Sequence, residues 1–194
     1  IETIGRKILQ EYDPALLDGP PQAVPIETII ETKFDLTLEY HCLRKNGSIL
    51  GETIFDEGAA ILYDQDEKRY RLIAVKAGTI LVEERLCVDR LLGRLRFTCA
   101  HELGHWVLHQ KLYSGTGDVA AYEGKTSLDE SYGLVEWQAD ALATALLMPL
   151  PQIKRSFYRL RAGRSHEHLV AEMARTFQVS KQAMRIRLET RNLI

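Results

Sequence analysis

Two histidines and a glutamate stand at metal-binding spacing near the middle of the chain. Residues 101–105 read His-Glu-Leu-Gly-His, inside a segment whose apolar residues recur every three or four positions, as in a helix. Histidines four apart project from one helix face about 6 Å apart along its axis, so His101 and His105 can direct ring nitrogens at one ion. Glu102 is turned by about 100° from His101, which places its carboxylate beside the ion, where an activated water needs a proton acceptor.

A third ligand is expected from the next strongly apolar helical segment, at about residues 134–148. Catalytic zinc commonly takes three protein ligands and keeps its fourth position for water. Glu136 can complete such a set with the two histidines, and Asp140, one turn later, can accept a hydrogen bond from the outer nitrogen of a ligating histidine. Alanines at alternate positions from 139 to 145 favour a close approach of the two helices. We therefore predict Zn²⁺ on these three ligands, with Glu102 as the general base.

Each part of this pattern also has a purely structural interpretation. The histidines and Glu102 can occur on an ordinary helix with the imidazoles bonded to backbone groups, and Glu136 and Asp140 can form a solvated acidic edge. His109 lies about 12 Å from His101 along the helix axis, too far to share its ion. We expect His109 behind a ligand, at the cleft edge or simply on the surface. A longer motif with a third histidine is absent, because position 111 is lysine.

A metal-activated water that attacks a carbonyl group also needs a hydrogen-bond donor for the oxyanion. Four side chains in or near the segment between the two helices can supply one: His109, Tyr113, Tyr122 and Tyr132. The sequence does not choose among them.

The elements around these residues read as a small sheet followed by helices. Strand-like runs occur at residues 36–42, 58–64, 70–75 and 79–84, separated by turn-rich segments. Helical runs are expected at residues 1–12, 26–34, 89–110, 134–148, 152–162, 166–177 and 180–191, with Ser180 as a cap. These patterns predict an α+β fold that is mostly helical with a small antiparallel sheet. We expect a catalytic domain at residues 1–150 and a basic helical segment at 151–194 packed on it.

Composition is that of a soluble globular protein. Hydrophobic residues make up 45% and charged residues 27%, and no stretch approaches the roughly 20 apolar residues of a membrane span. Charged residues interrupt the apolar ones at the start of the chain, so no signal peptide is expected. The three cysteines, Cys42, Cys87 and Cys99, are far apart and odd in number. We interpret them as free thiols and expect a cytoplasmic location.

Charge is distributed unevenly along the chain. The net charge of −2 hides a basic end, because residues 151–194 hold ten Lys and Arg against three Glu. The last two predicted helices, joined near residues 178–180, have a helix-turn-helix layout. The last helix has three basic residues that can meet phosphates, Lys181, Arg185 and Arg187. We prefer a solvated face that packs Met184, Ile186 and Leu188 inward, and the alternative is a catalytically silent DNA-binding or antitoxin-like regulator.

The motifs together resemble a known family. RFTCAHELGHWVLH, followed by an ExxAD pattern and then LLMP, is similar to the ImmA/IrrE family of zinc peptidases, and FQVSKQAMRIRLE is similar to its helical end. The resemblance covers about residues 95–188. It implies roles in the site for His101, Glu102, His105, Glu136 and Asp140. It further implies an intracellular endopeptidase whose protein substrate is a helix-turn-helix repressor, cleaved to derepress stress or mobile-element genes.

Overall fold

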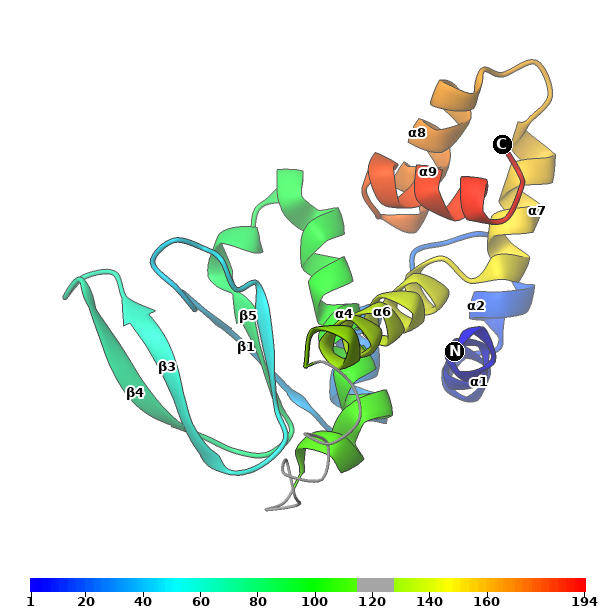
Figure 1. Cartoon of the computed structure of the whole chain (residues 1–194). Helices are drawn as coiled ribbons and strands as arrows, with labels where there is room; N and C mark the ends of the chain where they lie inside the picture. Colours follow the sequence, from blue (N-terminus) through cyan, green and yellow to red (C-terminus); the bar gives the residue numbers. More distant parts are fainter. Residues whose placement is uncertain (115–127) are drawn as a thin grey trace.

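Two long helices occupy the centre of the molecule, with strands on one side and shorter helices on the other (Figure 1). In this computed structural model the backbone is described for residues 1–114 and 128–194, and side chains for 1–114 and 133–194. The central helices are α4 (Leu92–Tyr113) and α6 (Leu128–Leu147). They make the most extensive contact between any two elements of the described chain. Any site built on both helices is therefore held at the centre of the fold.

Shorter helices pack around this central pair. They are α1 (Glu2–Tyr12), α2 (Ala15–Asp18), α3 (Ile26–Lys33), α7 (Leu150–Leu160), α8 (His166–Phe177) and α9 (Lys181–Thr190). Two 3-10 turns, η1 (Glu84–Leu86) and η2 (Asp89–Leu91), lead from the strands into α4.

Several helix ends follow from local sequence. Pro25 and Pro149 precede α3 and α7, where a residue without a backbone N–H costs nothing. The Ser165 and Ser180 hydroxyls accept backbone hydrogen bonds from the first turns of α8 and α9. The predicted cap at Ser180 is thus confirmed.

The strands form two small sheets. In the first, β5 (Thr79–Glu83) lies between β1 (Thr37–His41) and β2 (Gly51–Ile54). In the second, β3 (Gly58–Asp64) pairs with β4 (Arg69–Val75). The β3–β4 pair is antiparallel as predicted, and β2 is also antiparallel to β5, but β1 and β5 are parallel. The long connection between β1 and β5, which contains three other strands, gives the chain room for the crossover that parallel strands require.

The observed elements differ from the predicted ones in a few places. Strand β2 was not predicted, because its sequence Gly-Glu-Thr-Ile has one apolar residue and no alternation. Helix α2 was also missed. Residues 89–91 form η2 instead of the first turn of α4, and α6 begins at Leu128, earlier than expected. The α+β class itself is confirmed.

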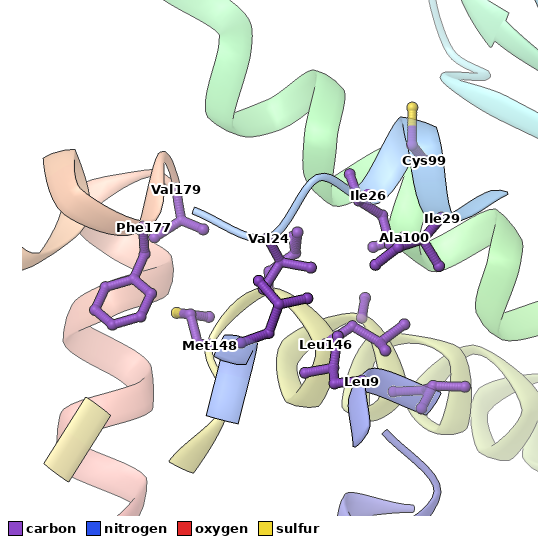
Figure 2. Close-up of a cluster of buried hydrophobic side chains, with 14 of the residues drawn as sticks. Leu9, Val24, Ile26, Ile29, Cys99, Ala100, Leu146, Met148, Phe177 and Val179 are labelled. Carbon is purple, nitrogen blue, oxygen red and sulfur yellow. The ribbon is translucent and has the colours of Figure 1, made fainter. Parts of the chain in front are cut away.

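One hydrophobic core joins the site helices to both ends of the chain. Leu9, Ile29, Ala100, Leu146 and Phe177 all lie in it with no exposed surface (Figure 2). A separate, smaller cluster lies beneath the β3–β4 hairpin. In the described parts of the chain, no helix is both long and apolar enough to cross a bilayer. The cysteines are free thiols, as expected.

Candidate metal centre

Helices α4 and α6 approach each other closely at Gly104. A Cβ atom placed on Gly104 would lie 3.0 Å from both the Cα and the carbonyl oxygen of Ala139. Ala139 is itself fully buried. A glycine on one helix and an alanine on the other therefore let the two backbones come near contact, and side chains that flank the crossing can converge from both helices.

Three predicted ligands converge beside this crossing. The Nε2 atoms of His101 and His105 lie 2.9 Å apart. One carboxylate oxygen of Glu136 lies 3.3 Å from His101 Nε2, and the other lies 3.4 Å from His105 Nε2. Among the residues with described side chains, these three form the group of histidine and acidic residues that could hold a metal ion.

The spacing of these donors suits a small divalent ion. Zinc binds nitrogen and oxygen ligands at about 2.0–2.2 Å, so the ligands of a tetrahedral site lie about 3.3–3.6 Å apart. The separations of 2.9 to 3.4 Å between the three donors are close to this range. Two imidazoles and one carboxylate are also a donor set that suits zinc and other divalent transition metals. The residues present therefore fit a metal ion.

The outer ring nitrogens of the two histidines have different partners. His101 Nδ1 lies 2.9 Å from Asp140 Oδ1, as the sequence predicted. His105 Nδ1 lies 3.1 Å from His109 Nδ1, and His109 Nε2 in turn lies 3.0 Å from Gln138 Oε1. These bonds leave both Nε2 atoms facing Glu136, which is the orientation that ligation requires.

Of the positions left open for His109, the structure selects the one behind a ligand. Its side chain is 1% exposed and does not line the cleft, so it lies neither on the surface nor at the cleft edge. Sequence reasoning missed Gln138, its partner. A glutamine on a helix carries no metal-binding pattern, and only the crossing of α4 and α6 brings Gln138 to His109.

The different partners give the two histidines opposite pKa shifts. Burial alone would lower the pKa of His101, but its hydrogen bond to Asp140 and the carboxylates nearby raise it. His105 has no carboxylate on its outer nitrogen. Burial, together with the neighbouring His101 and His109, lowers its pKa to about 4. His105 is therefore neutral at physiological pH, the form in which an imidazole binds a metal.

Glu102 lies beside the three candidate ligands and is 7% exposed. Burial raises its pKa to about 7, even though a hydrogen bond from Thr53 opposes the shift. The Thr53 hydroxyl oxygen lies 2.7 Å from Glu102 Oε2 and 3.0 Å from the main-chain oxygen of the same residue. A carboxyl group with a pKa near neutrality can both accept and return a proton.

A cavity of ≈ 550 Å³ opens over these residues. Its lining includes all three candidate ligands, Glu102, several aromatic side chains and two residues of strand β2, Gly51 and Thr53. Tyr113 is one of these aromatic residues and stacks on Phe55, with ring centroids 5.2 Å apart. Tyr113 therefore lies at the cleft, and the side chains of Tyr122 and Tyr132 fall outside the described residues.

Comparison with known proteins identifies a family and a fold. A search of curated proteins gave no match. Among solved structures, a Mycobacterium tuberculosis transcriptional regulator aligns with a TM-score of 0.56 and 15% sequence identity, over 96% of this chain and 45% of that one. This chain thus spans less than half the length of that regulator, and the likeness shows the fold alone. The Peptidase M78 model, described as the IrrE N-terminal-like domain, matches residues 63–189, and the chain belongs to this family.

Proposed function

We propose that this chain is a zinc-dependent endopeptidase. The observation that carries the proposal is the convergence of two imidazoles and a carboxylate on one point, next to a buried glutamate and inside an open cleft. Membership of a peptidase family supports the same function.

In the proposed mechanism, His101, His105 and Glu136 hold the ion. Zinc in this position would supply a Lewis acid that acidifies a water molecule and polarises the scissile carbonyl group. Glu102 accepts a proton from the attacking water and then delivers it to the leaving amine. Asp140 orients His101, and His109 orients His105 from behind. Among the candidates whose side chains the structure describes, Tyr113 lines the cleft and is the proposed oxyanion donor.

The proposed substrate is a protein, namely a helix-turn-helix repressor in the cytoplasm. Its cleavage would derepress stress or mobile-element genes. This part of the proposal rests on the likeness of the chain's motifs to ImmA/IrrE peptidases and on its place in the IrrE N-terminal-like family.

A DNA-binding regulator receives less support from the C-terminal helices. Helices α8 and α9 are joined by a short turn at Gln178, which has a left-handed backbone with φ of 52°. Arg187, which in the DNA-binding alternative would meet phosphates, is 3% exposed and binds the Glu2 carboxylate and the Met148 carbonyl oxygen. The expectation that Ile186 packs inward was also wrong, because this residue is 51% exposed. Arg187 points inward in place of Ile186, so the exposed face of α9 has fewer basic side chains that could contact DNA.

The test is metal analysis of the purified protein, combined with incubation against the repressor encoded nearest to its gene. We expect cleavage that stops with a chelator and returns with zinc. Glu102→Gln should keep its zinc and lose cleavage by at least about 100-fold, because proton transfer to a positioned base contributes 10²–10⁴-fold. Glu57→Gln, at an exposed position, is the matched control. Full cleavage by the Glu102 variant would remove Glu102 from the role of base, whereas zinc-free protein with salt-dependent DNA affinity would favour the regulator.

A further inference from the structure

Strand β2 packs on α4 beside the candidate metal centre and touches the proposed base. Alternate residues of a strand face the same side, so Gly51 and Thr53 share one face. Both line the cleft together with Glu102. The contact joins residues 49 positions apart in the chain, so it depends on tertiary structure alone.

The Thr53 hydroxyl lies within hydrogen-bonding distance of two Glu102 oxygens and can donate its one hydrogen to either of them. The hydroxyl oxygen lies 2.7 Å from the carboxylate and 3.0 Å from the main-chain oxygen of Glu102. Among the described residues, this hydroxyl is the side-chain donor that meets the Glu102 carboxylate. The same hydroxyl also lies against the backbone of α4, so it fixes the position of the carboxylate relative to the helical turn that holds His101.

Gly51 leaves the space that the Glu102 side chain occupies. A Cβ atom on Gly51 would lie 2.5 Å from Glu102 Oε1, 2.7 Å from its Cγ and 2.8 Å from its Cδ. All three distances are shorter than van der Waals contact. Any side chain at position 51 must therefore displace either the strand or Glu102.

We propose that Gly51 and Thr53 are positioning residues for Glu102: the hydroxyl restrains one carboxylate oxygen, and the absent side chain accommodates the other. This inference rests on the proposed function, in which Glu102 is the base. A glutamate has three rotatable bonds, and a base must be held to well under 1 Å to act efficiently. Strand β2 supplies the restraint and keeps Glu102 beside the metal ligands instead of among them.

The first test compares Gly51→Ala in the native and Glu102→Ala backgrounds, by thermal unfolding and by crystal structures. In the native background we expect either a Tm lower by about 2–10 °C, because the strand is forced away, or a normal Tm with a displaced Glu102 side chain. In the Glu102→Ala background, the same substitution should change Tm by less than about 1 °C. Gly58→Ala is the matched control, since a Cβ there meets nothing within 4 Å.

The second test measures kcat and KM of the Thr53→Val and Thr53→Ser variants, with the repressor that the native protein cleaves as the substrate. The valine variant should lose kcat by about 10–100-fold with little change in KM, and its zinc content should match that of the native protein. Serine restores the hydroxyl and should recover most of the rate. Thr37→Val, on an exposed position of β1, is the control.

The two tests separate failure of this inference from failure of the proposed function. The thermal and crystallographic comparison needs neither substrate nor metal, so it reads the contact even if the native protein cleaves nothing. Equal effects of Gly51→Ala in both backgrounds, with Glu102 unmoved, would overturn the inference. So would a Thr53→Val enzyme with native kcat in a protein that does cleave its repressor.

Discussion

The two sides of the cleft hold their functional residues in different ways. On the helical side, α4 and α6 place His101, His105 and Glu136 at positions set by helix periodicity and by the close crossing at Gly104. On the strand side, β2 reaches Glu102 through one hydroxyl and one missing side chain. Metal ligands thus come from regular spacing within helices, whereas the orientation of the base comes from a segment remote in sequence.

The two sides also differ in burial. The helices around the site belong to the main hydrophobic core, where Ala100, Leu103, Leu142 and Leu146 have no exposed surface. Strand β2 is an edge strand, and each of its residues is partly exposed. Changes on the helical side should therefore affect stability and metal binding together, while changes on the strand side should act mainly on the base.

The largest effect is expected from removing a ligand on the helical side. Glu136→Ala leaves two imidazoles for the ion and should weaken zinc binding by more than the 10–100-fold typical of losing a group behind a ligand. Competition with a chelating dye measures the affinity. The exposed Glu57→Ala serves as the control, and native zinc affinity in Glu136→Ala would remove Glu136 from the site.

The helix crossing itself gives the next prediction. Gly104→Val places methyl groups against the Ala139 backbone and should destabilise the fold by about 1–3 kcal/mol, with a matching loss of zinc. Gly133→Val, at an open position of α6, should leave both nearly unchanged. Thermal unfolding with and without zinc measures both effects. A variant at Gly104 with native stability would mean that the crossing tolerates more separation than its geometry indicates.

A smaller effect should distinguish the two histidines. Asp140→Asn removes a charge that bonds directly to His101, and we expect about tenfold weaker zinc binding. Gln138→Leu acts on His105 only through His109, so its effect should be several-fold smaller. Zinc titration of both variants under one set of conditions provides the measurement. Equal losses would contradict the difference between a direct and a relayed partner.

The smallest effect is a pH dependence of the metal-free protein. The pKa of His105 falls from 6.5 to about 4 on folding, so the unfolded chain binds more protons in this window and stability is lost as pH falls through it. The pKa of Glu102 rises from 4.5 to about 7 on folding. The folded chain therefore binds more protons at this group, and its contribution to stability is lost as pH rises. The two contributions oppose each other between pH 4.5 and 6.5.

Glu102→Gln separates these contributions. Because the variant lacks the opposing Glu102 contribution, the Tm of the metal-free variant should rise by a few degrees from pH 4.5 to 6.5 relative to the native protein. Parallel curves for the two proteins would contradict the assignment of the opposing contribution to Glu102.

Much of the helical side could be predicted from the sequence. His101 and His105 recur at one helical turn, as do Glu136 and Asp140, and the alanines of α6 indicate a close neighbour. These are short-range patterns, and helix geometry converts them directly into side-chain directions. The family model matches the same stretch of chain but begins only at residue 63, after β2.

The rest depended on tertiary structure. Nothing in Gly51 to Ile54 distinguishes these residues from a loop, and a threonine or glutamine acquires its role only from its partner. The parallel pairing of β1 with β5, the contact of Thr53 with Glu102 and the reach of Gln138 to His109 all join segments distant in the chain. Local periodicity determines which face of a helix carries the functional side chains, whereas the packing of separate elements decides which residues that face contacts. The physical reason is that a contact needs two surfaces, and the sequence pattern of one element describes only the surface of that element.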